Sequence, residues 1–153
     1  MAVERNLARI ANFFDEVWNW GNLAVVDQNV ADDFSYHDPA NPWVAPGPPG
    51  VTDLVLTYRT AFPDLRFVLE DVIAEGDKVV VRWRAEGTHE GNLRHIPATG
   101  TRVSTTGITI FCLVGGKIAE AWTNYDMLRL LSELGVVSTP EEPSPEGFEP
   151  CGR

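Results

Sequence analysis

Residues 34–49 read FSYHDPANPWVAPGPP and hold a tyrosine, a histidine, an aspartate and an asparagine close together. Asp38 is the residue of this run best suited to exchange a proton with a bound molecule, and Tyr36 is a candidate ligand contact. His37 lies between them and would point to the opposite face of an extended strand. The alternative for Asp38 is structural, because an aspartate before a proline favours a turn and can bond its own backbone.

A second carboxylate, Asp64, follows a proline in the motif FPDL. Two carboxylates can divide acid and base roles when an apolar pocket favours the neutral form of one while the other stays ionised. The alternative is a structural turn in which Asp64 bonds backbone amides. Asn124 is a candidate ligand contact if a bulge turns it inward, whereas Asp126 is placed to cap a helix.

The chain has 3 histidines, at positions 37, 89 and 95, and none has the HxH or HExxH spacing of a zinc site. The sequence therefore predicts no metal and no other cofactor. His89 lies in GTHEG, where the favoured interpretation is a histidine bonded to backbone at the end of a strand.

Hydrophobic periodicity predicts the elements that position these residues. Helical spacing runs from Leu7 to Trp18, and further helices are expected at residues 23–30, 50–62 and 127–134. Strands are expected within residues 34–49 and at residues 66–75, 78–89, 102–114 and 117–125, with tight turns at EGDK and GGK. This order predicts an α+β fold in which N-terminal helices pack on a curved antiparallel sheet and enclose an apolar pocket, as in a cone.

Alternation along the two central strands predicts which side chains face that pocket. One strand would contribute Val79, Val81, Trp83 and Ala85, and the next Thr105, Gly107, Thr109 and Phe111. We expect an aromatic wall formed by Trp18, Trp83 and Phe111.

Composition limits the partners. A formal net charge of -10 argues against nucleic acid, and no apolar run approaches the ~20 residues that a membrane helix needs. The N-terminus lacks a secretory pattern and the two cysteines are far apart, so we expect a cytoplasmic protein.

Ile118 and Trp122 are expected on the outer sheet face, where an uncovered apolar pair predicts a homodimer. Residues 1–137 are expected to form one domain, followed by a proline- and glutamate-rich tail at 138–153.

Three stretches carry a resemblance to a known family. Residues 62–91 read FPDLRFVLEDVIAEGDKVVVRWRAEGTHEG, residues 96–122 read IPATGTRVSTTGITIFCLVGGKIAEAW, and residues 130–135 read LLSELG. In this order they resemble the SnoaL-like polyketide cyclases, or ester cyclases. The resemblance implies the cone fold of nuclear transport factor 2 and ketosteroid isomerase, which hosts several reaction types as well as binding proteins.

The resemblance also bears on catalytic groups. The founding cyclases close a ring by an intramolecular aldol step, using a carboxylate and a nearby histidine. Those positions fall on Thr123 and Thr109 here, and a threonine hydroxyl is too weak an acid to exchange a carbon-bound proton at neutral pH. A polar pocket position of the family falls on Asp38, and similarity to epoxide hydrolases and pyran-forming cyclases of this fold implies a pocket acid near Asp64.

Two functions from different classes remain open. The first is a cofactor-free acid–base enzyme that cyclises, isomerises, dehydrates or opens an epoxide in a hydrophobic polyketide or related natural product. Its catalytic residues would be Asp38 and Asp64, and its substrate contacts Trp18, Tyr36, Trp83, Thr109, Phe111, Thr123 and Asn124. The second is a non-catalytic small-molecule-binding or dimerisation protein of the same fold.

Overall fold

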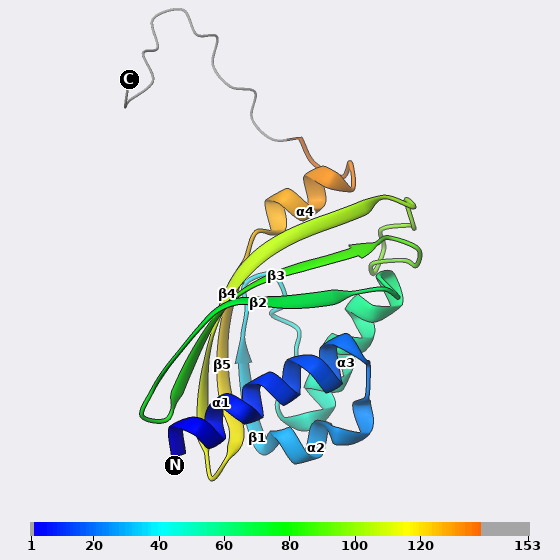
Figure 1. Ribbon diagram of the computed structural model, residues 1–153. Coiled ribbons are helices and arrows are strands. Elements are labelled where there is room, and N and C mark those ends of the chain that lie inside the picture. The colour runs from blue at the N-terminus through cyan, green and yellow to red at the C-terminus, as the bar shows by residue number, and fades with distance from the viewer. Residues whose placement is uncertain (1, 139–153) are drawn as a thin grey trace, which may run out of the picture.

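The computed structural model describes residues 2–138, so almost all of the expected tail lies outside the described residues. Within these residues the structure has four α-helices, two other helical turns and five strands (Figure 1). In chain order they are α1 Ala2–Asn12, a π-helical turn Phe13–Asn19, a 3₁₀ turn Leu23–Val25, α2 Val26–Asn29, β1 Val30–His37, α3 Gly47–Ala61, β2 Arg66–Glu75, β3 Lys78–Thr88, β4 Arg102–Val114, β5 Lys117–Tyr125 and α4 Met127–Glu133.

The five strands form one curved sheet in the order β1-β5-β4-β3-β2, with α1, α2 and α3 against its inner face (Figure 1). Strands β2 to β5 are an antiparallel meander, as the turns at EGDK and GGK predict. The expectation of a wholly antiparallel sheet is wrong at one edge, because β1 pairs with β5 in parallel. After β1 the chain passes through α3 to the far edge, and the returning meander brings β5 back in the direction of β1. The predicted α+β cone is otherwise confirmed.

The helices depart from their predicted bounds for local reasons. The first helix widens at Phe13 into a π-helical turn, in which the Trp20 amide donates to the Asp15 carbonyl at 3.0 Å. This wider turn places Phe13 and Phe14 together in the core. Helix α3 begins at Gly47 rather than at residue 50, because its first turn accepts the prolines of GPP, whose missing amides have no intrahelical role there.

The alternation expected in β3 and β4 is confirmed, since the residues predicted to face inward are all buried. Gly107 is required by a close approach of Trp83: a Cβ at that position would lie 2.3 Å from the indole ring. The glycine therefore leaves room for the Trp83 indole, whose nitrogen donates to the Thr109 hydroxyl two residues further along β4.

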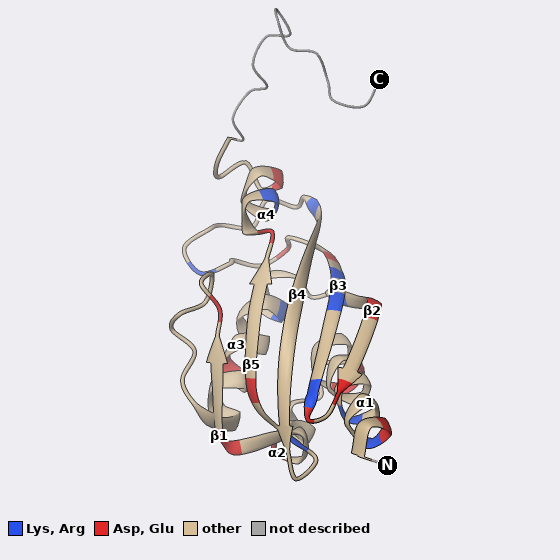
Figure 2. Cartoon of the chain, turned by 90° about the vertical axis from the view of Figure 1, so that its left-hand side faces the viewer, with Lys and Arg blue, Asp and Glu red and all other residues tan. Residues whose placement is uncertain are grey.

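Of the two residues predicted on the outer face, Ile118 and Trp122, only Trp122 lies there. Ile118 is 1% exposed, because the strand register shifts opposite Cys112 and turns this side chain into the core. Trp122 does lie on the outer face, where its ring stacks on that of His37 at a centroid distance of 5.4 Å. The exposed apolar side chains of this face include Ile108 and Ile110 on β4, in a region of few charged residues (Figure 2).

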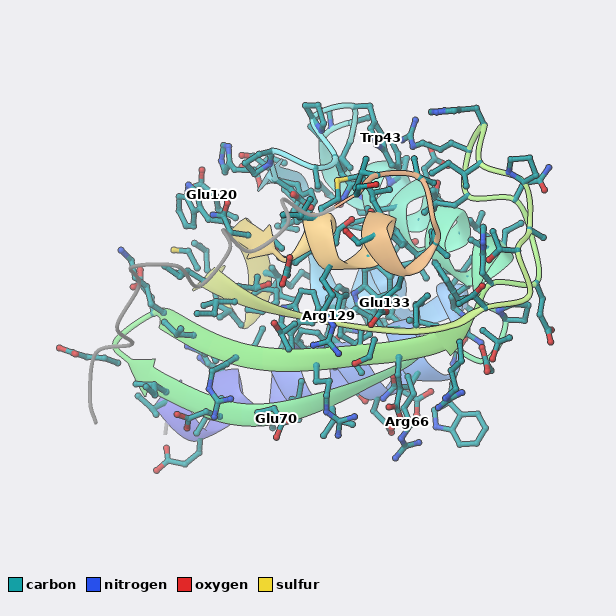
Figure 3. The ribbon with its side chains drawn as sticks, turned by 90° about the horizontal axis from the view of Figure 1, so that it is seen from above. Trp43, Arg66, Glu70, Glu120, Arg129 and Glu133 are labelled. Atoms are coloured by element: carbon teal, nitrogen blue, oxygen red, sulfur yellow. The ribbon has the colours of Figure 1, made fainter. Side chains whose placement is uncertain are left out.

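Helix α4 is bound to the first residues of β4. Asp126 caps the helix as predicted, accepting from the Arg129 amide at 2.9 Å. Glu133 accepts from the Ser104 amide of β4 at 2.8 Å and from the Arg129 side chain (Figure 3). In this position the helix buries Leu130 in the core. Within residues 2–138, no helix has the length and apolar character needed to cross a membrane.

Candidate active site

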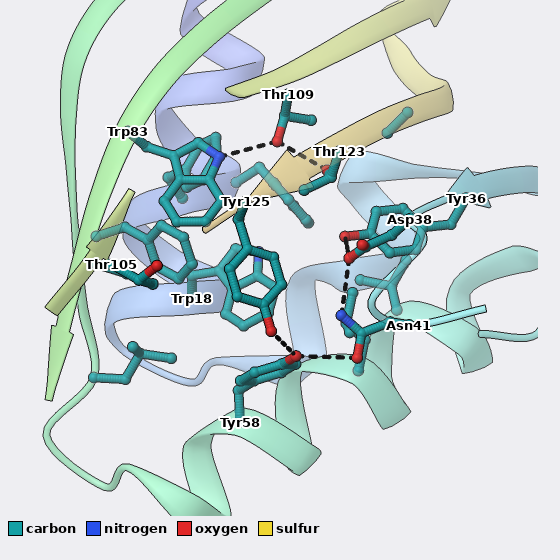
Figure 4. Close-up of a pocket in the computed structure, with 18 of the residues that line it drawn as sticks. Trp18, Tyr36, Asp38, Asn41, Tyr58, Trp83, Thr105, Thr109, Thr123 and Tyr125 are labelled. Carbon is teal, nitrogen blue, oxygen red and sulfur yellow. Dashed lines mark hydrogen bonds between the residues drawn. The ribbon is translucent and has the colours of Figure 1, made fainter. Parts of the chain in front are cut away.

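A cavity of about 100 Å³ lies between the sheet, α3 and the π-helical turn. Most of its lining is apolar or aromatic, and its polar side chains belong to Tyr36, Asp38, Asn41, Tyr58, Trp83, Glu86, Thr105, Thr109, Thr123 and Tyr125, all but Glu86 labelled in Figure 4. An apolar enclosure with a few convergent polar groups is the usual form of a small-molecule site.

The structure places most of the predicted site residues in this cavity. The residues that line it are Trp18, Tyr36, Asp38, Trp83, Thr109, Phe111 and Thr123. Asn124 is exposed and does not line the cavity, because the alternation of β5 holds from Ala121 to Tyr125 and leaves Asn124 on the outer face. The inward turn expected for Asn124 is therefore absent.

Asp64 also lies outside the cavity lining, with 47% of its side chain exposed. Its carboxylate accepts from the Thr88 amide at 2.7 Å and from the Thr88 hydroxyl at 2.9 Å. Burial raises the pKa of the carboxyl, but the hydrogen bonds and the nearby Arg102 charge together outweigh it, so the pKa lies below its usual value. Asp64 thus follows the structural alternative, and the expected pairing with Asp38 in one pocket is not formed.

Asp38 lies directly after β1, where the chain turns at Pro39, and only 6% of it is exposed. Three donors hold its carboxylate: the Tyr36 hydroxyl and the Asn41 amide donate to Oδ2 at 2.9 and 2.8 Å, and the Ala40 backbone amide donates to Oδ1 at 2.9 Å. Both the structural and the pocket-facing interpretation of Asp38 therefore apply. The two bonds occupy the lone pairs of Oδ2, whereas Oδ1 keeps one lone pair for a ligand.

A chain of hydrogen bonds leads from Asp38 across the cavity wall (Figure 4). The Tyr58 hydroxyl donates to Asn41 Oδ1 at 3.0 Å, and the Tyr58 and Tyr125 hydroxyls lie 2.8 Å apart. Because the single Tyr58 hydrogen is used on Asn41, Tyr125 must be the donor to Tyr58. The bonds therefore all point the same way, from Tyr125 through Tyr58 and Asn41 to the carboxylate.

Sequence reasoning missed Asn41, Tyr58 and Tyr125. Asn41 belongs to the polar run around Asp38, and Tyr58 occupies the apolar stripe of its helix. A buried phenol normally needs a partner for its hydroxyl, so a tyrosine on an apolar helix face is the signal that could have identified Tyr58. Tyr125 follows from the alternation that places Thr123 inward.

The three phenols of the site are held in their neutral form. Burial raises the pKa of Tyr36, Tyr58 and Tyr125 above the usual value. The negative charge of Asp38 acts in the same direction on each, whereas a hydrogen bond from Thr123 partly opposes the rise at Tyr36. At neutral pH all three hydroxyls therefore retain their hydrogens and act as donors.

A second polar group lies on the sheet side of the cavity. The Trp83 indole donates to the Thr109 hydroxyl at 3.0 Å, and the Thr109 and Thr123 hydroxyls lie 2.9 Å apart (Figure 4). These are the two positions at which the resemblance expects a histidine and a carboxylate. Here a directly bonded pair of hydroxyls replaces them.

The histidines take no part in the cavity. His37 is exposed and binds Glu120 at 2.7 Å, while His89 is buried and accepts from the Thr99 amide through Nδ1. Burial lowers the pKa of His89, which favours a neutral ring. In the described part of the chain, no group of three or more His, Cys, Asp or Glu side chains could hold a metal ion.

Comparison with known proteins identifies the family. The model of the SnoaL-like polyketide cyclase family matches residues 8–134. The chain belongs to this family.

The relatives of this SnoaL-like protein support the assignment. It is 33% identical over 106 residues to aklanonic acid methyl ester cyclase DauD of a Streptomyces strain, a match that covers 69% of this chain and 63% of the relative. A solved protein of Acidithiobacillus ferrooxidans, assigned to the polyketide cyclases, has 30% identity and a TM-score of 0.78 over 86% of this chain and 94% of its own. A Jannaschia protein assigned as SnoaL-like has 27% identity and a TM-score of 0.79 over 90% and 94%.

Proposed function

We propose that this protein is a cofactor-free enzyme of the polyketide cyclase type, in which Asp38 exchanges a proton with a hydrophobic substrate. The observation that carries the proposal is the position of Asp38: its carboxylate faces an apolar cavity, three donors fix its orientation, and Oδ1 keeps a free lone pair. A base that is fixed and shielded from water is suited to removing a proton from carbon.

The reaction that fits this arrangement best is ring closure by an intramolecular aldol step. Asp38 Oδ1 would take a proton from a carbon next to a carbonyl, and the resulting enolate carbon would form a bond to a second carbonyl carbon of the same molecule. The proton would then pass from Asp38 to the new alkoxide, so the product has the composition of the substrate. Tyr36 and Asn41 act as positioning residues, because they bind the carboxylate rather than the substrate.

The threonine pair supports a secondary role on the sheet side. One hydrogen of the two hydroxyls forms the bond between Thr109 and Thr123, which leaves the second for Tyr36 or for a substrate carbonyl. A hydroxyl there can orient a carbonyl, but it cannot replace the carboxylate and histidine of the founding cyclases.

The presence of threonines where the founding cyclases have a carboxylate and a histidine favours the second candidate, a non-catalytic binding protein. In that case the cavity would hold an apolar ligand, and the carboxylate would serve only to shape the turn after β1. The two candidates differ in one measurable respect, which is whether a bound polyketide is converted.

The experiment follows from the named relative. Purified protein is incubated with aklanonic acid methyl ester and with simpler linear diketo esters, and the products are separated by liquid chromatography with mass detection. The cyclase proposal expects a product of unchanged mass and altered retention, formed by the wild type and slowed at least a hundredfold in Asp38→Asn. Binding of these compounds without conversion supports the binding protein instead, and conversion by Asp38→Asn at the wild-type rate refutes the role of Asp38.

A further inference from the structure

The hydroxyl hydrogens on the tyrosine side of the cavity are all committed. Tyr36 donates to Asp38, Tyr58 donates to Asn41, and Tyr125 donates to Tyr58. Each phenol has one hydrogen, so none of the three can donate to a ligand without breaking a bond within the protein.

The oxygen atoms on the same side are only partly used. Tyr125 Oη accepts no hydrogen bond from residues 2–138, Tyr58 Oη accepts one, and Asp38 Oδ1 accepts one. Each retains at least one lone pair next to the cavity that all three residues line. This side of the pocket therefore presents hydrogen-bond acceptors and no free phenolic donor.

Aromatic rings flank these acceptors. Trp83 lies 6.1 Å from Tyr125 and Trp18 lies 6.4 Å from Tyr58, measured between ring centroids. The cavity of about 100 Å³ is of the order of the engineered cavity of about 150 Å³ that holds one benzene ring. One ring of a ligand can occupy it, with an edge substituent directed at the tyrosines.

We infer that the pocket selects ligands that present a hydroxyl hydrogen to Tyr125, and hence the phenolic or enolic form of a polyketide-type ring rather than its keto form. The inference rests on the proposed function only in placing the substrate in this cavity. A carbonyl oxygen in the same place would face the lone pairs of Tyr125 and Tyr58 and would lose its hydrogen bonds to water without replacement. A site built around a ligand hydroxyl rejects an analogue without it much more strongly than it rejects a change of size.

The test uses two unreactive probes of similar shape, 4-indanol with a phenolic hydrogen and 1-indanone with a carbonyl. Their dissociation constants for the full-length protein are measured by titration calorimetry. The wild type should bind 4-indanol at least tenfold more tightly. Equal affinity, tighter binding of 1-indanone, or no binding of either probe overturns the inference.

Two variants test the direction of the hydrogen-bond chain. Tyr125→Phe removes the acceptor, so the preference for 4-indanol should fall below about threefold. Tyr58→Phe removes the group to which Tyr125 donates and frees the Tyr125 hydrogen, so the affinity for 1-indanone should rise relative to 4-indanol. Thr57→Val removes a hydroxyl that bonds the Asp53 carbonyl outside the cavity and should leave both constants unchanged. A wild-type preference retained by Tyr125→Phe would refute the role of Tyr125.

Because both probes are unreactive, the result is independent of turnover. Failure of the proposed enzyme activity would leave the probe preference standing, and failure of the preference would leave Asp38 chemistry intact.

Discussion

Tyr58→Phe should destabilise the protein more than Tyr125→Phe, although each removes one hydroxyl from the same pair. Tyr58 supplies the hydrogen bond to Asn41 Oδ1, and Asn41 is only 4% exposed. Loss of this donor leaves a buried acceptor without a partner, which costs about 1–3 kcal/mol. Tyr125→Phe leaves that bond intact and removes one ordinary hydrogen bond, worth about 0.5–1.5 kcal/mol.

The assay is urea unfolding followed by tryptophan fluorescence, with equal m-values as the check that the unfolded states match. For a domain of this size the larger cost corresponds to a fall in melting temperature of roughly 2–12 °C. The double variant should match Tyr58→Phe within about 0.5 kcal/mol, because Tyr125 has already lost its partner there. An equal effect of the two single variants, or a larger effect of Tyr125→Phe, would show that the chain does not run toward Asp38.

Three further predictions concern chemistry, assembly and pH. Asp38→Asn should lower turnover by roughly a hundred- to ten-thousandfold, whereas Asp64→Asn should stay within a few fold of the wild type, as steady-state kinetics would show. Sedimentation at micromolar concentration should give a mass near twice 16.9 kDa, and Ile108→Glu, which charges the outer face of β4, should give the monomer mass; a monomeric wild type would reject the dimer. Because folding lowers the pKa of Asp64, its ionised carboxylate stabilises the folded state at pH values above the pKa of the unfolded chain. This contribution is lost as the pH falls below about 4. Acid unfolding of Asp64→Asn should therefore show a shallower loss of stability in that range, and an unchanged acid limb would contradict it.

The bounds of β2, β4 and β5 could be predicted from the sequence because alternation and tight turns are local signals. The position of Ile118 could not, since a one-residue shift of register reverses the side chains and arises from pairing with a distant strand. Asn124 was misplaced for the opposite reason: a bulge was allowed where the strand stays regular.

The candidate site was only partly accessible from the sequence. Asp38 could be identified as a candidate because other polar residues, Tyr36, His37 and Asn41, lie close to it in the sequence. The hydrogen-bond chain through Tyr58 and Tyr125 joins residues 67 positions apart, so only the fold that brings the two hydroxyls together reveals it. Asp64 was proposed as a second acid because the resemblance to epoxide hydrolases and pyran-forming cyclases implies a pocket acid near it, but its hydrogen-bond partner is Thr88, at the end of β3.

The parallel pairing of β1 with β5 also bears on how the molecule is made. Tyr36 lies opposite Ala121, so the segment that carries Asp38 reaches its sheet neighbour only when the last strand has been synthesised. Pairings between such distant segments close large loops and form slowly. On the ribosome, α1 to β4 can emerge while the edge next to Asp38 still has no strand beside it. A chain interrupted before β5 would lack Thr123 and Tyr125, and β1 would have no strand to pair with. Such a chain could therefore not form even part of the candidate active site.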